Sequence, residues 1–414
     1  MRRSDTTWLA GICAARTGAS MMSMAYPAIL PIVQREWGLS ATAAGSISSG
    51  FQFGTAFALV VVSTLADRVG ARIVFLWAAF ASAVVSLLLP ILAQGYLSAL
   101  FLFSALAVSL AGMYTPGLML LAERFPVGRR GWAIGWFLAS SSIGYTLALG
   151  LAGLVVPVGG WRMALIAVAL GPVTCAALAI PILRGTPRRP STGQATWKFG
   201  GDLLNNRAAQ LMIAGYTFHS WELLGMWAWT PAFLTAVLAT QGLEVSRSAG
   251  IGANLTALFH VMGIAASSMG GWLSDRWGRT AVILGMMTMS TLCSFTFGWL
   301  LTAPLIVVVL VGLVYGFSAI GDSPVYSTGI TEVVEPAHLG SVLAVRSLLG
   351  FGAGAVAPLV FGTVLDLTDG RAGPAGGVWG WAFAVLGIGG FLGICSMLWL
   401  RAVPESRRMA SGKR

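Results

Sequence analysis

Four ionisable side chains stand inside long apolar stretches of this 414-residue sequence: Arg16, Glu222, Asp322 and Arg346. An ionised side chain near the centre of a bilayer costs at least about 2.5 to 3.5 kcal/mol, so such residues usually face one another or a cavity. A guanidinium group can grip a carboxylate or a phosphate through paired hydrogen bonds, and a buried carboxyl group can take up and release a proton. Because the two positive and two negative charges balance, we predict that all four surround a central cavity.

Helical spacing places polar residues on four stripes that would line such a cavity. The stripes are Tyr315, Ser318, Asp322 and Tyr326; His219, Glu222, Met226 and Trp229; Ser48, Gln52 and Thr55; and Thr256, His260 and Ser267. From these stripes and the arginines we expect a substrate site made of Arg16, Arg346, Gln52, Tyr315, Tyr326 and Trp229. The expected proton-coupling residues are Glu222, Asp322, His219 and His260, since buried carboxyl groups and histidines can change charge near neutral pH.

The amino-acid composition predicts that these residues lie in membrane-spanning helices. Hydrophobic residues make up 57% of the chain and charged residues only 9%, far from the quarter that is charged in soluble domains. Spanning helices need roughly 20 apolar residues each. The apolar runs predict twelve such helices, at about 7–33, 41–66, 72–94, 97–122, 131–157, 162–183, 208–239, 248–273, 280–301, 303–330, 338–366 and 378–401.

The basic residues are sorted by side of the membrane. Nineteen of the 25 Lys and Arg residues fall in the termini and in alternate connections on one side, which predicts that both termini are cytoplasmic. The net charge of +11 is therefore a matter of topology, and we expect no binding of nucleic acid. No signal peptide is expected before the first run. Cys13, Cys175, Cys293 and Cys395 all lie in apolar runs, which argues against disulfides.

A repeat relates the two halves of the sequence. Asp67-Arg68-Val69-Gly70-Ala71-Arg72 follows the second predicted helix, and Asp275-Arg276-Trp277-Gly278-Arg279 follows the eighth, 208 residues later. The same spacing, within one residue, relates Gly112 to Gly321, Glu123 to Glu332 and Gly131 to Gly340. We predict an N-terminal bundle over 1–183, a cytoplasmic linker over 184–207 and a C-terminal bundle over 208–414.

The paired Asp-Arg-x-Gly loops resemble the hallmark loop of the major facilitator superfamily, and the resemblance covers the whole chain. It implies an all-α membrane protein with twelve transmembrane helices in two pseudo-symmetric six-helix bundles. It also implies a secondary transporter that binds its substrate between rocking halves. The loops would then be conformational gates formed by Asp67, Arg68, Gly70, Arg72, Asp275, Arg276, Gly278 and Arg279. The first copy departs from the family pattern at Ser63 and Ala71.

In this family the first and seventh helices face each other across the transport path. Arg16 stands eleven residues before Pro27, and Glu222 stands nine before Pro231. Since two residues of helical rise are about 3 Å, the resemblance places Arg16 and Glu222 at nearly the same depth, where they can pair. The alternative is that Arg16 reaches the membrane surface or pairs with Asp322.

Several functions remain open at this point. The arginines favour a small organic anion as substrate, carried with proton coupling, but if Glu222 and Asp322 neutralise them the substrate is neutral or zwitterionic. A drug/proton antiporter is disfavoured because antiporters of this family typically carry a Gly-Pro-rich stretch in the fifth helix, and here the stretch from Ser142 to Gly150 has no proline. A copper(I) importer would use Met21, Met22, Met24, Met226, His260 and Met262. A receptor or scaffold is the non-transport alternative.

Enzymatic chemistry is not expected. The sequence has no phosphate-binding loop of the Gly-x-x-x-x-Gly-Lys-Ser/Thr type and no triad or metal-ligand spacing among its three histidines. We therefore expect neither a metal ion nor a cofactor. The expected partners are a small-molecule substrate, protons and membrane lipid, and the expected state is a monomer in the plasma (inner) membrane.

Overall fold

The computed structural model describes residues 3–186, 205–335, 338–368 and 377–413, and its secondary structure there is helical throughout. Most of the predicted linker, residues 187–204, lies outside the described residues. The helices of the first half are α1 (Arg3–Met21), α2 (Ala25–Glu36), α3 (Ala41–Val69), α4 (Ala71–Leu92), α5 (Tyr96–Arg124) and α6 (Val127–Ile182), with the 3₁₀ turn η1 (Met22–Met24) between α1 and α2.

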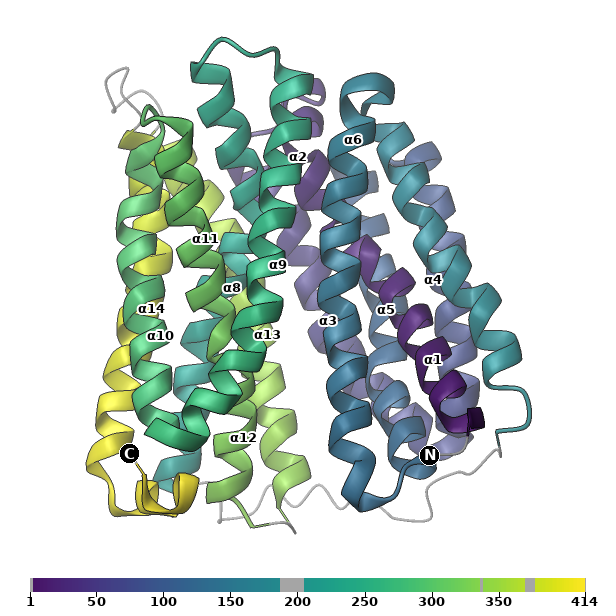
Figure 1. Ribbon diagram of the computed structural model, residues 1–414. Coiled ribbons are helices and arrows are strands. Elements are labelled where there is room, and N and C mark those ends of the chain that lie inside the picture. Colours follow the sequence, from purple (N-terminus) through teal and green to yellow (C-terminus); the bar gives the residue numbers. More distant parts are fainter. Residues whose placement is uncertain (1–2, 187–204, 336–337, 369–376, 414) are drawn as a thin grey trace. The chain divides into compact units, whose positions relative to one another are not determined.

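The second half continues the helical pattern (Figure 1). Its helices are α8 (Arg207–Thr240), α9 (Val245–Trp277), α10 (Arg279–Phe297), α11 (Leu305–Gly321), α12 (Ser323–Val333), α13 (Leu339–Thr368) and α14 (Gly377–Ala402). Two 3₁₀ segments, η2 (Gly298–Leu300) and η3 (Pro404–Gly412), complete it. Within the described residues, ten helical segments are long and apolar enough to cross a membrane, so the chain is a multi-pass membrane protein.

Four of the predicted spans differ from the simple expectation, and one of them, at about 303–330, is divided into α11 and α12 at Asp322. The predicted helix at about 7–33 is interrupted by η1, and it is not among the ten segments. The predicted helices at about 131–157 and 162–183 form the continuous segment α6, whose backbone departs from helical geometry at Gly160. There φ is +69°, a conformation that glycine adopts at little steric cost.

The chain forms two compact units, and each takes in the first turns of one helix from the other half of the sequence. Unit 1 comprises 1–39, 50–195 and 243–257, and unit 2 comprises 40–49, 196–242 and 258–414. In unit 2 the Asp366 carboxylate accepts hydrogen bonds from the backbone N–H groups of Ala41 at 2.8 Å and Thr42 at 2.7 Å. An acidic group at a helix N-terminus accepts hydrogen bonds from the free N–H groups and interacts favourably with the positive end of the helix dipole. Asp366 on α13 therefore stabilises the start of α3.

The two Asp-Arg-x-Gly loops share one backbone geometry. Gly70 has φ +95° and ψ 137°, and Gly278 has φ +97° and ψ 153°. In each case one helix ends just before the glycine and the next begins just after it. The repeat seen in the sequence is therefore a repeat of a tight turn that requires a positive φ angle.

We expect Gly278→Ala to lower the thermal stability of the purified protein by about 1 to 2 kcal/mol, because a Cβ atom at this positive φ is strained. The control is Gly271→Ala, seven residues earlier in α9, where a Cβ would meet no other atom within 4 Å. That change should leave the melting temperature in detergent unchanged or raise it, because alanine favours helix. Equal effects of both substitutions would contradict the assignment of strain to Gly278.

Candidate functional site

Arg346 lies in unit 2 beside two residues of neighbouring helices. It is buried on α13, its Nη2 atom donates to Ser327 Oγ at 3.1 Å, and its guanidinium carbon lies 3.9 Å from the centre of the Tyr216 ring. Its Nε and Nη1 atoms are also buried, and within the described part of the chain they have no hydrogen-bond partner. Arg346 therefore has two buried donor atoms, on different edges of the guanidinium plane, that can each bond to a further acceptor.

Asp322 lies next to His219 rather than in an ion pair with an arginine. It stands at the break between α11 and α12, and its Oδ1 atom is 3.0 Å from His219 Nδ1. The other ring nitrogen of His219, Nε2, is 2.7 Å from Ser323 Oγ. Both His219 and Asp322 are almost fully buried, so their contact is shielded from water.

Aromatic packing connects the arginine to this pair. The Tyr216 ring lies beneath Arg346, and its centre is 5.7 Å from the His219 ring. Ser327 donates to the carbonyl group of Ser323 at 3.0 Å, one helical turn away. We call this group the arginine–histidine cluster; its members are Tyr216, His219, Asp322, Ser323, Ser327 and Arg346.

Arg16 occupies a neutral environment in unit 1. Its Nε atom donates to Ser141 Oγ at 2.9 Å. Its guanidinium carbon lies 5.4 Å from the Tyr114 ring centre and 5.5 Å from that of Phe137, so both rings can stabilise the positive charge. Because Glu222 belongs to unit 2, the proposed Arg16 to Glu222 pairing stays a prediction.

Glu222 is held by hydroxyl groups of α10. Its Oε1 atom accepts from Ser294 at 2.7 Å and its Oε2 atom from Ser290 at 3.1 Å. The side chain is buried, and Ser294 also bonds with the hydroxyl of Tyr315. Glu222 and His219, three residues apart on α8, thus reach different neighbouring helices.

Of the other expected site residues, Tyr326 packs against the cluster, with its ring centre 5.7 Å from that of His219 and 6.0 Å from that of Tyr216. Trp229 donates its indole N–H to the carbonyl of Pro358 at 3.0 Å and stacks on Phe361. Tyr326 is fully buried and donates to Met287 Sδ, while His260 is buried with its ring 5.1 Å from Trp227. Gln52 is half-buried on α3 in unit 1.

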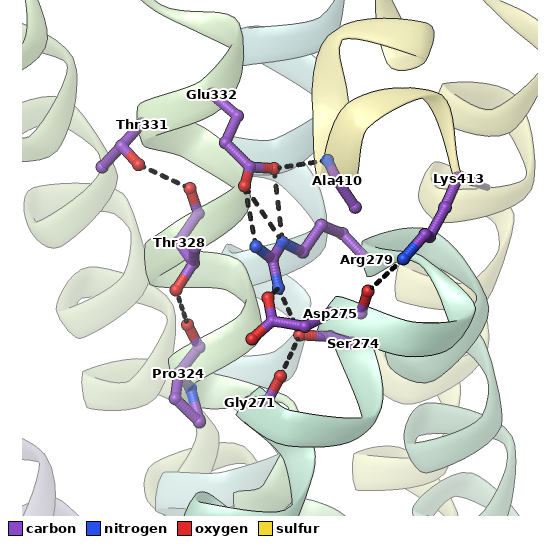
Figure 2. Close-up of polar contacts among 10 residues, drawn as sticks. All are labelled: Gly271, Ser274, Asp275, Arg279, Pro324, Thr328, Thr331, Glu332, Ala410 and Lys413. Carbon is purple, nitrogen blue, oxygen red and sulfur yellow. Dashed lines mark hydrogen bonds and ion pairs between the residues drawn. The ribbon is translucent and has the colours of Figure 1, made fainter.

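The second Asp-Arg-x-Gly loop carries a network of charges, shown in Figure 2. Arg279 donates through Nη1 to Asp275 at 2.6 Å and through Nη2 to Glu332 at 2.8 Å. The C-terminal segment joins it, because the Ala410 N–H donates to Glu332 at 3.0 Å and Lys413 donates to the Asp275 carbonyl at 2.7 Å.

The remaining loop residues make fewer contacts. Arg276 is exposed and stacks on Trp272, with 3.9 Å from its guanidinium carbon to the ring centre. In the first copy Arg72 donates to the carbonyl of Thr186 at 2.8 Å, Asp67 is half-buried and Arg68 is exposed. The two copies share a turn, but in the second the arginine after the glycine bonds to carboxylates.

We expect Glu332→Ala to destabilise the protein by about 3 kcal/mol, since it leaves the buried Arg279 without its main partner. The readout is the melting temperature of the purified protein in detergent. Glu335→Ala, an exposed position three residues on, is the matched control and should have no effect. An unchanged melting temperature in Glu332→Ala would show that its ion pair with Arg279 does not stabilise the protein, and a similar loss in both variants would show that the effect is not specific to Glu332.

Sequence reasoning missed several partners. Tyr216, Ser323 and Ser327 were not expected, although Tyr216 lies one helical turn before His219 and the two serines lie one turn apart. Ser290 and Ser294 were also missed, and their spacing of four residues on one predicted helix was the signal that could have found them.

Comparison with known proteins agrees with this architecture. The family model described as Major Facilitator Superfamily matches residues 12–358. A gallate transporter of Pseudomonas putida is 26% identical over 65% of this chain and 66% of its own length, and a hexuronate transporter of Bacillus subtilis is 22% identical over 82% of each. A solved bacterial homologue of the human lysosomal transporter Spinster, inward-facing and unoccupied, superposes with a TM-score of 0.72 at 15% identity, covering 100% of this chain and 99% of that one. The chain belongs to the major facilitator superfamily of membrane transporters.

Proposed function

We propose that this protein is a secondary transporter of a small organic anion, working by alternating access and coupled to protons. The observation that carries the proposal is Arg346, a buried guanidinium with two donors left for an acceptor among the described residues. A carboxylate is an acceptor that suits a charged guanidinium donor. Asp322 contacts His219, so the arginine is not neutralised by the acid that could have cancelled its charge.

The names of two relatives support the proposal that the substrate is an organic anion. Gallate and hexuronate are both organic anions, and their transporters match this chain over most of its length. Arg16 supplies a second cationic group whose contacts in unit 1 are to a hydroxyl and to aromatic rings. We infer that Arg346 binds the carboxylate of the substrate, and Arg16 remains a separate candidate for binding an anion.

We propose that the Asp322–His219 pair binds and releases the coupled proton. The pair is buried and touches the same Tyr216 ring that supports Arg346, so a proton there changes the charge close to the bound anion. Coupling then follows from electrostatics: protonation favours the anion, and loss of the proton favours its release.

The proposed architecture is twelve spans in two six-helix bundles, over 1–183 and 208–414 with the linker 184–207. It counts α1 to α2 as one span, α6 as two and α11 to α12 as one, in addition to the remaining helices. The sorting of basic residues supports cytoplasmic termini, and we place the protein as a monomer in the inner membrane.

The proposal is tested with matched pairs of solutes that differ only in charge. Purified protein is titrated with glucuronate and glucuronamide, and with gallate and its amide, while melting is recorded; uptake into proteoliposomes is measured for the same pairs. The carboxylates should raise the melting temperature and enter the vesicles, because a ligand stabilises the state that binds it. Equal binding of amides and carboxylates would contradict the proposal of an anionic substrate and would favour a neutral one.

A further inference from the structure

The carboxylate of Glu222 lies in a pocket of hydroxyl groups inside unit 2, apart from the arginine–histidine cluster. Three of the hydroxyls come from one stretch of α10, Ser290, Thr291 and Ser294, and Tyr315 of α11 adds a fourth next to Ser294. Glu222 itself is 2% exposed. The pocket therefore offers oxygen atoms only, and it offers more of them than one carboxyl group needs.

Thr291 points to a ligand in this pocket. Its Oγ1 atom is buried and has no hydrogen-bond partner within the described residues. A Cβ atom built on Gly390 of α14 would lie 2.3 Å from Thr291 Oγ1 and 2.7 Å from Glu222 Oε2. Both oxygens thus border the same place beside α14, and glycine keeps a side chain out of it.

The charge of Glu222 needs a cation. Two acidic side chains are buried in the described part of the chain, and Asp322 has His219 beside it, whereas the side chains bonded to Glu222 are uncharged serines. An ionised carboxylate inside a protein is costly unless it is paired. A proton can neutralise it, but a proton leaves the buried Thr291 hydroxyl without a partner among the described residues.

A monovalent metal ion accounts for both observations. Hard cations prefer carboxylate and hydroxyl oxygens, and a single carboxylate balances one positive charge but not two. We propose that Glu222, Ser290, Thr291 and Ser294 bind a sodium ion. The proposed sodium site is distinct from the anion site, because its residues lie on α8 and α10, beside α14. It does not depend on Arg346.

Thermal stability in matched salts tests the proposal directly. The full-length protein in detergent is melted in sodium, potassium and N-methylglucamine chlorides at equal ionic strength, with no organic anion present. Sodium should raise the melting temperature above the other two salts in a saturable manner. The same melting temperature in all three salts would overturn the proposal and leave the anion site untouched.

Three variants locate the ion. Thr291→Val has nearly the same shape and removes one hydroxyl without a partner, so it should fold and bind sodium about tenfold more weakly. Glu222→Gln should abolish the sodium effect. Thr296→Val is the control on the same helix, since Thr296 is exposed and donates to the carbonyl of Leu292, and it should keep the full effect. A sodium effect that survives intact in Thr291→Val would place the ion elsewhere, even if Glu222→Gln did not fold.

Discussion

Replacing Arg346 by lysine should weaken the binding of a carboxylate substrate by about 10- to 100-fold, although the charge is kept. Hydrogen bonds to charged groups contribute about 1.5 to 3 kcal/mol, and Arg346 has two buried donor atoms without a partner among the described residues, Nε and Nη1. A lysine ammonium is a single point of charge, and it cannot offer two donors in one plane. Calorimetric titration of the purified variant with the best carboxylate of the matched pairs gives the loss directly.

The control for this change is Arg162→Lys. Arg162 is half-exposed and lies 3.5 Å from Glu36 in an ion pair at the surface of unit 1. Surface pairs of this kind contribute little, so the substitution should leave affinity unchanged. An Arg346→Lys variant that binds the carboxylate as tightly as the parent would remove Arg346 from the site, and the corresponding change Arg16→Lys would become the next test.

Most of the membrane-spanning helices were predictable from the sequence, and their interruptions were less so. Apolar runs give the positions of helices because the bilayer sets their length. They do not show that α1 and α2 are separated by η1, or that Asp322 stands at a break between α11 and α12. The positive-φ glycines of the two loops were predictable, because the repeated Asp-Arg-x-Gly pattern and the need for a tight turn point to the same residue.

The site residues illustrate a different limit. Counting residues from a proline gives the depth of Glu222 in its helix, but the rotation of the side chain depends on which helix packs beside it. The stripe that joins His219, Glu222 and Trp229 is broad enough for these side chains to meet three different helices. Serines in membrane helices also bond to their own backbone, as Ser220 does to Tyr216, so their type alone does not reveal a partner such as Glu222.

Replacing Asp322 by asparagine should abolish uptake driven by a pH gradient while sparing exchange of substrate across the membrane. Asparagine keeps the size of the side chain but cannot gain or lose a proton, so the 3.0 Å contact with His219 no longer changes its charge during the cycle. Exchange needs only that the substrate-bound protein changes between its outward- and inward-facing conformations, and this step does not use the pH gradient.

Two assays in the same proteoliposomes separate these steps. Uptake is measured after an imposed pH jump, and exchange is measured with labelled substrate outside and unlabelled substrate inside at equal pH. Glu335→Gln, a neutralised carboxylate at an exposed position, is the control and should behave as the parent does in both. If Asp322→Asn retains gradient-driven uptake, the proton is carried elsewhere. If it loses uptake and exchange together, Asp322 holds the structure or the substrate instead, because a residue needed only for coupling leaves exchange intact.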